Sequence, residues 1–207
     1  MPDLATSLPT PGAVLDYWIN AAGEDHLFAD RQHKLWFTKS AATDAFITRQ
    51  FAPLHAALQD GLADSWAEAG PRSRLAAIIV LDQFSRNMFR GTPAAFASDA
   101  LALRLARAGV GAGDDLALAE IERSFFYLPF EHSESLPDQV DSVSMFEQLQ
   151  INARPVFIRI CASSSEYAKR HKDVIERFGR FPHRNAILGR ENTPEEADYL
   201  SKPGAGF

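Results

Sequence analysis

Apolar side chains recur along the chain mostly three and four residues apart, which is the spacing of one face of an α-helix. This pattern predicts helices at about 11–22, 42–59, 72–89, 93–108, 115–128, 136–150, 155–178 and 193–200, with less regular pieces near 27–38, 62–69 and 184–188. No stretch shows the period-two alternation of a strand or the composition of a linker. The sequence therefore predicts one all-α domain over residues 1–207, with short flexible ends at about 1–10 and 201–207.

Glycine and proline mark the expected ends of these helices. Pro129 is predicted to close the helix at 115–128, and the "GVGAG" run at 109–113 is interpreted as a plain connector. Thr193 followed by Pro194 has the signature of a helix start. No period of about 34 residues recurs, so the pattern favours an irregular array of antiparallel helices over a regular solenoid.

Composition narrows the class of protein. With 207 residues, 46% of them hydrophobic, the chain is large enough to bury a substantial core. Its single cysteine, Cys161, allows no internal disulfide and fits a reducing compartment. The N-terminal stretch has no basic segment followed by an apolar run, and the longest apolar run, Leu75 to Leu81, is far shorter than the ~20 residues of a membrane span. We expect a cytoplasmic protein with no membrane partner.

Charge is distributed unevenly. The net charge is −6, yet Lys169 to Arg190 contains seven Lys and Arg against Asp173 and Glu176, so this stretch carries +5 and the rest of the chain −11. Such asymmetry favours a local site for an anion and disfavours general affinity for nucleic acid.

The stretch "RLAAIIVLDQFSRNMFRG" is apolar all round in its first half, which is typical of a buried helix. Asp82 and Arg86 lie four residues apart on it, and polar groups on a buried helix need partners. In one interpretation they form an internal pair that ties neighbouring helices. In the other, Arg86, Asn87 and Arg90 line a pocket beside Gln83, while Asp82 holds Arg86.

A second polar stretch, "YLPFEHSESLPDQ", joins two predicted helices and contains His132 and Glu134. A histidine beside carboxylates can move protons or ligate a metal, whereas the alternative is helix capping and solvation. The chain has none of the spaced ligand motifs of common metal sites and no glycine-rich nucleotide motif. We therefore expect no metal and no cofactor.

The third stretch, "RFGRFPHRN", cannot form one helix because Gly179 and Pro182 interrupt it. Its first residue, Arg177, can pair with Asp173 four residues earlier, which leaves Arg180, His183, Arg184 and Asn185 as the candidate polar residues. Arginine binds carboxylate or phosphate through its planar fork, so this turn is a candidate anion site. The alternative is that these arginines bind helix carbonyls and acids of the protein itself.

These stretches resemble a bacterial family of unknown function, the domain-of-unknown-function 924 family. The resemblance covers roughly Val14 to Leu200 and rests on "LDQFSRNMFRG" with "FASDALA", on "FFYLPFEHSE" with a following "DQ", and on "HKDVIERFGRFPHRNAILGRENTPEEADYL". It implies a tetratricopeptide-like right-handed superhelix and no particular reaction. The matching family positions include Asp99, Ser133 and Arg190 in addition to the candidates above.

The first hypothesis is a pocket between helices that binds an anionic small molecule or peptide, with acid–base catalysis as an option. Its candidate acid–base residues are His132, Glu134 and His183, and its candidate ligand-binding residues are Asp82, Gln83, Arg86, Asn87, Arg90, Arg180, Arg184 and Asn185. The second hypothesis is a non-catalytic scaffold for a protein partner, in which the same residues are internal ties. Nucleic-acid binding is the third and least favoured hypothesis, and a homodimer is compatible with the sequence.

Overall fold

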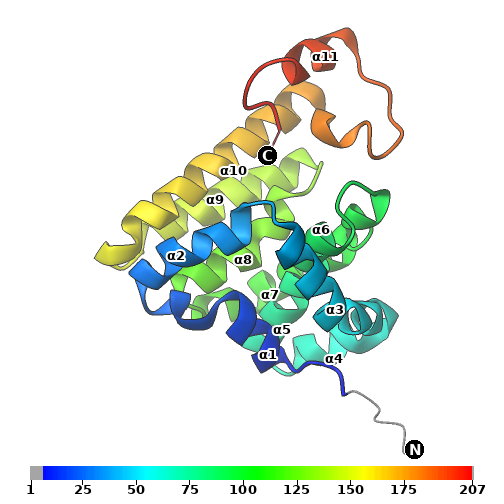
Figure 1. Ribbon diagram of the computed structural model, residues 1–207. Helices are drawn as coiled ribbons and strands as arrows, with labels where there is room; N and C mark the ends of the chain where they lie inside the picture. Colours follow the sequence, from blue (N-terminus) through cyan, green and yellow to red (C-terminus); the bar gives the residue numbers. More distant parts are fainter. Residues whose placement is uncertain (1–6, 207) are drawn as a thin grey trace, which may run out of the picture.

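Helices account for nearly all regular structure in the computed structural model, which describes residues 7–206 (Figure 1). The α-helices are α1 (Pro11–Trp18), α2 (His26–Phe37), α3 (Ala41–Ala57), α4 (Ala63–Glu68), α5 (Pro71–Ile79), α6 (Ser85–Met88), α7 (Asp99–Ala112), α8 (Glu120–Glu131), α9 (Leu136–Ile151), α10 (Ile158–Phe178) and α11 (Pro194–Leu200). Residues 7–206 contain no strand. The predicted all-α class is confirmed, while the superhelical arrangement stays a prediction.

The helix α5 lies at the centre of the core. Every residue from Leu75 to Leu81 is fully buried, as the apolar pattern predicted. This helix packs against α1, α7 and α8, so residues distant in the sequence converge on it. Burying one leucine or isoleucine side chain contributes about 1.5–3 kcal/mol, so this helix makes a large contribution to apolar stabilisation. A π-helical turn at Val80–Phe84 joins it to α6.

The glycine-rich run at 109–113 is not a connector, which corrects the expectation. Helix α7 continues through it to Ala112 and ends at Gly113, whose φ of 78° gives a left-handed cap. Gly109 is buried, and a Cβ there would lie 2.4 Å from Cζ of Phe126 and 2.6 Å from Cδ of Arg74. This glycine therefore permits close packing between α7 and α8 and does not break the helix.

Pro129 does not end its helix either. It lies inside α8, which continues to Glu131, and His132 is the residue that caps the end of this helix. The amide of Gln139 in α9 donates to three carbonyl oxygens at this end, those of residues 130, 131 and 133, at 3.3, 2.7 and 2.7 Å. These bonds hold the end of α8 in place, so Glu131 is a buried helical residue and not a loop residue.

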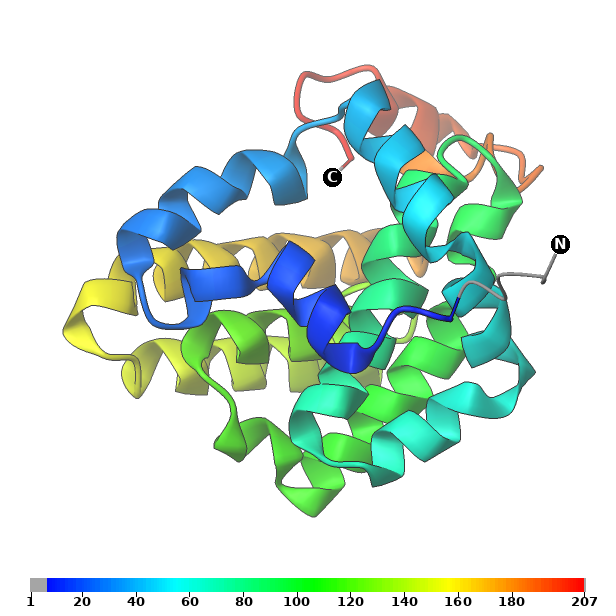
Figure 2. The ribbon, with the colours of Figure 1, turned by 60° about the horizontal axis from the view of Figure 1, so that its bottom comes forward.

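The chain continues from α10 into a segment that we call the C-terminal cap, residues 179–206. Figures 1 and 2 both show it at one edge of the molecule, beside the end of α10 and away from α4. A small apolar cluster separate from the main core contains Phe181 of the cap with Val174 and Ile175 of α10, and Phe178 and Tyr199 pack against it. The predicted cap of α11 is confirmed, because Thr193 accepts a hydrogen bond from Glu196 N at 3.2 Å.

The expected flexible N-terminal end mostly lies outside the described residues. Within them, Thr10 caps α1 by accepting a hydrogen bond from the amide of Ala13 at 3.2 Å. At the other end, residues 201–206 form turns after α11. Among the described helices, none combines the length and the apolar character needed to cross a membrane.

Candidate functional site

Asp82 and His132 form the central pair of the candidate site. Oδ1 of Asp82 lies 2.7 Å from Nδ1 of His132, and Nε2 of Gln83 donates to Oδ2 of Asp82 at 2.6 Å. Asp82 lies in the π-helical turn, and His132 is the residue that follows α8. The pair therefore joins two of the predicted stretches. Irregular turns of this kind occur frequently at functional sites. Asp82 is buried, while the side chain of His132 retains 14% of its exposure.

Charges around the pair fix its protonation. Burial alone would raise the pKa of Asp82, but Arg86 and His132 lower it well below its ordinary value, so Asp82 is an anion. Burial and the nearby Arg86 lower the pKa of His132 against the opposing effect of Asp82. Since a carboxylate only accepts, Nδ1 of the neutral His132 carries the proton and donates it to Asp82. The Nε2 atom of His132 is then a base.

Arg86 lies between two carboxylates. Its Nη1 is 3.1 Å from Oδ1 of Asp82, as expected from the four-residue spacing, and it also donates to the Asp82 carbonyl at 2.7 Å. Its two terminal nitrogens reach the two oxygens of Asp99 at 3.1 Å each. Asp99 is the first residue of α7, so Arg86 connects α6 with α7. Together with the bond to the Asp82 carbonyl, this bidentate pair uses three of the five N–H donors of Arg86.

Arg184 is the least satisfied cation of the cluster. It is 7% exposed, and its Nη1 lies 3.5 Å from Oδ2 of Asp99, which already pairs with Arg86. Its guanidinium carbon lies 4.8 Å from the ring centre of Phe96 and 4.5 Å from that of Phe181, so two aromatic rings contact it. Its Nε atom is buried with no hydrogen-bond partner among the described residues. Burial and Arg86 lower the pKa of Arg184 to about 10, so it keeps its charge at neutral pH.

Glu131 and His171 meet beside this cluster, with 3.2 Å between Oε1 of Glu131 and Nδ1 of His171. Burial and the charge of Asp82 raise the pKa of Glu131 to about 8, and burial lowers the pKa of His171 to about 2. At neutral pH both groups are therefore uncharged, and the contact is not an ion pair. The Nδ1 atom of His171 also donates to the Tyr167 carbonyl at 2.9 Å.

His183 lies next to Arg184 at the start of the C-terminal cap. Its ring centre is 5.6 Å from that of Phe181. Burial and Arg184 lower the pKa of His183 to about 4, so it is neutral in the physiological range. The backbone of Gly206 approaches it closely, because a Cβ on Gly206 would lie 3.1 Å from Cβ of His183. The end of the cap thus covers this histidine.

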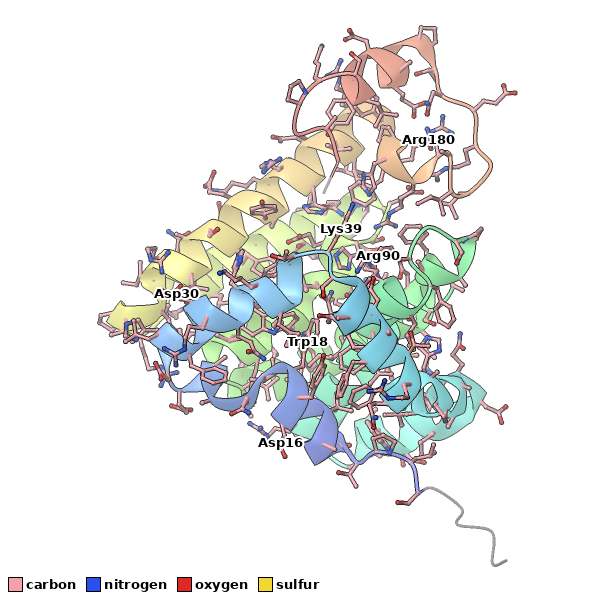
Figure 3. All side chains as sticks on the ribbon, viewed as in Figure 1. Asp16, Trp18, Asp30, Lys39, Arg90 and Arg180 are labelled. Atoms are coloured by element: carbon pink, nitrogen blue, oxygen red, sulfur yellow. The ribbon has the colours of Figure 1, made fainter. Side chains whose placement is uncertain are left out.

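Other predicted residues pair within the protein. Arg90 donates to both oxygens of Asp44 at 2.7 and 2.8 Å, and Asn87 donates to the same carboxylate at 2.8 Å, which ties α6 to α3. Arg180 donates to both oxygens of Glu196 at 2.6 and 2.7 Å, inside the cap. Figure 3 labels Arg90 beside α3 and Arg180 in the cap, and the two belong to separate pairs.

Glu134 and Asn185 also have internal partners. Glu134 accepts two hydrogen bonds from Arg190, at 2.7 and 2.9 Å, and one from the Phe181 amide at 2.8 Å. Asn185 donates to Oδ1 of Asn192 at 2.8 Å. The cluster proper therefore consists of Asp82, Gln83, Arg86, Asp99, Glu131, His132, His171, His183 and Arg184.

Sequence reasoning did not select Asp99 or Glu131 as site residues. Asp99 begins a helix, and an acid there is usually explained by the helix dipole. Only the match of Asp99 to a position of the family motif pointed to a role at the site. Glu131 belongs to the stretch "YLPFEHSESLPDQ", whose sequence predicts a connection between two helices and not the burial of this carboxyl.

Two surface hollows of the described chain lie away from this cluster. One of about 340 Å³ is lined by residues that include Glu24, Glu120 and Arg154, and one of about 450 Å³ runs along α7 near Leu103. Arg184 itself is buried. Among residues 7–206, no three His, Cys, Asp or Glu side chains are arranged to hold a metal ion.

Comparison with known proteins adds the family. A family described as a bacterial protein of unknown function (DUF924) matches residues 14–204. The chain belongs to the DUF924 family. It is similar to the solved structure of ATU0120 from Agrobacterium tumefaciens, a protein of unknown function, with a TM-score of 0.76 and 39% identity over 92% of this chain and 96% of that one. No curated protein matches the sequence. This DUF924 protein therefore shares its fold with ATU0120, and its chemistry has to be inferred from the site.

Proposed function

We propose that the cluster binds an anionic group of a small molecule or peptide, a carboxylate or a phosphate, through Arg184. The supporting observation is the buried Nε atom of Arg184, which has no hydrogen-bond partner among residues 7–206. An unpaired buried donor costs free energy, about 1–3 kcal/mol, and a donor on a charged group costs more. A ligand oxygen would satisfy it, and guanidinium geometry favours two parallel bonds to one anion.

The Asp82–His132 pair gives this site an acid–base group. Asp82 fixes the ring tautomer and stabilises the imidazolium that would form when Nε2 of His132 accepts a proton. The lowered pKa of His132 keeps the ring neutral and ready to act as a base at neutral pH. The chemistry supported is therefore proton abstraction from a group attached to, or near, the bound anion. Glu134 is not assigned to this step, because its carboxylate binds Arg190. His183 is not assigned to it either, because the end of the cap covers its ring.

One observation favours the scaffold alternative. The pairs of Arg90 with Asp44 and Arg180 with Glu196 consume polar residues that also match the family. In that reading, Asp99 is the intended anion for Arg184, and the cluster serves only to join helices. The 3.5 Å contact between Arg184 and Asp99 is long for a dedicated charge pair, which supports the ligand site instead.

Thermal unfolding with added anions tests the proposal. We would screen inorganic phosphate, acetate, and phosphorylated and carboxylated metabolites against the natural protein, Arg184→Ala and Arg159→Ala. Arg159 is an exposed arginine at the start of α10 and pairs with Asp30, so its variant controls for lost charge. A ligand at 100 times its dissociation constant should stabilise the natural protein and the control by about 2.7 kcal/mol and Arg184→Ala by much less. Stabilisation of all three to the same extent would refute the site.

A further inference from the structure

A small apolar cluster shared with the end of α10 seats the C-terminal cap. Phe181 is fully buried within that cluster, which also holds Ile175 and is separate from the core around α5. Within the cap, Arg180 and Asn185 bind Glu196, which links its first turn to α11. A segment that is tied internally and joined to the preceding helix through a small separate cluster can move as a unit.

Beyond this small cluster, polar contacts hold the cap against the rest of the molecule. Glu134, in the loop between α8 and α9, accepts two bonds from Arg190 and one from the Phe181 amide. Arg184 reaches across to Asp99 at 3.5 Å and stacks on Phe96. Polar contacts at the rim of an interface exchange with water more readily than a continuous apolar core does.

The connection between α10 and the cap is Gly179. Its φ of 67° lies in the left-handed region, and a Cβ there would meet no atom within 4 Å. Its amide donates to the Ile175 carbonyl at 2.8 Å, which ends the helix. A glycine in open space at a helix end can absorb a change in backbone angles without a steric clash, as hinge residues do.

The cap also closes the site. His183 and Arg184 belong to it, whereas Asp82, Arg86 and His132 belong to the body. The unpartnered Nε of Arg184 is buried, so a ligand cannot reach it while these two parts stay in contact.

We propose that the C-terminal cap, residues 179–206, is a lid that turns about Gly179, and that Glu134 is its latch to Arg190 and Phe181. The lid opens to admit the anion and carries Arg184 back onto it. This inference rests on the proposed anion site, and it assigns Glu134 to control of access and not to proton transfer.

Hydrogen–deuterium exchange of the full chain tests the lid. Glu134→Ala should raise the exchange rate of backbone amides at 180–190 by about tenfold, since it removes three bonds to a charged group, while amides of α5 and α8 stay unchanged. Glu191→Ala, a matched loss of an exposed acid in the cap, should leave both regions as in the natural protein. Arg190→Ala, which breaks the latch from the other side, should repeat the effect of Glu134→Ala.

Inorganic phosphate separates the two proposals. If it slows exchange at 180–190 in the natural protein, both stand. If Glu134→Ala and Arg190→Ala open the cap selectively but phosphate and the anions of the thermal screen change nothing, the lid stands and the anion site falls. If these variants leave exchange at 180–190 unchanged, or raise exchange throughout the chain, the lid is refuted whatever phosphate does.

Discussion

Asp99 contacts two arginines from different parts of the chain, Arg86 at 3.1 Å and Arg184 at 3.5 Å. Arg86 has a second carboxylate in Asp82, whereas Arg184 depends on a shared one. Because of this difference in partners, we regard Arg86 as a structural arginine and Arg184 as the arginine available to a ligand. This assignment leads directly to different expectations for the two alanine variants.

Arg86→Ala should destabilise the protein by roughly 3–5 kcal/mol, because it leaves Asp82 as a buried carboxylate with one partner fewer. Proton uptake by Asp82 should reduce this loss at low pH. Arg184→Ala should change stability by about 1 kcal/mol or less, since it also removes a buried and poorly compensated charge. Paired urea melts without ligand measure both. A loss in Arg184→Ala as large as that in Arg86→Ala would make Arg184 an internal tie.

His132 should be neutral at pH 7, with the proton on Nδ1. The reason is that burial and Arg86 lower the pKa of this ring below the ordinary 6.5, while Asp82 accepts the Nδ1 proton. Nitrogen NMR of the imidazole across pH 4 to 8 would show both the titration and the tautomer. A ring that is charged at pH 7, or whose proton lies on Nε2, would remove the proposed base.

Glu131→Gln should stabilise the protein, and increasingly so as pH rises. The folded-state pKa of Glu131, about 8, lies above its ordinary 4.5, so the native state binds a proton that the unfolded state has released. The contribution of Glu131 to the stability of the natural protein therefore falls as pH rises from about 4.5 to 8. We expect a difference near zero at pH 4.5 and about 4 kcal/mol in favour of the variant at pH 8.

Urea melts at several pH values test this, with Glu68→Gln as the control at an exposed position of α4. A Glu131→Gln difference that does not depend on pH would show that Glu131 ionises normally in the folded protein.

Gly109→Ala and Gly111→Ala should have opposite effects. A Cβ at 109 would overlap Phe126 and the side chain of Arg74, so we expect a loss of about 1–3 kcal/mol. A Cβ at 111 meets nothing within 4 Å, and alanine there should add about 0.5–1 kcal/mol through helix propensity. Thermal melts of the two variants decide it. Equal changes in stability would mean that close packing does not require a glycine at position 109.

Helix periodicity was sufficient to predict the helical class and the burial of Leu75 to Leu81, because a helix that is apolar all round has few alternatives to the interior. It failed at Gly109 and Pro129, where contacts with other helices decide the outcome: Gly109 meets Phe126, and Gln139 ties the end of α8. Local patterns do not contain these contacts.

The same limit applies to the site. The Asp82–Arg86 pair follows from a spacing of four, but the bidentate partner of Arg86 is Asp99, 13 residues away. Arg180 and Arg184 are alike in sequence, yet Glu196 satisfies one and no residue in the described chain satisfies Nε of the other. Which arginine is left over depends on tertiary packing.

The most direct test of the anion site observes the Nε–H group of Arg184 itself. In nitrogen–proton NMR spectra, its signal can be assigned by its absence from Arg184→Ala, and the Nε–H of Arg159 serves as a remote reference. Added inorganic phosphate, or the anion that stabilises the protein most in the thermal screen, should shift the Arg184 signal to saturation and leave that of Arg159 in place. An Arg184 signal that stays unchanged while such an anion binds elsewhere would contradict the proposed anion site.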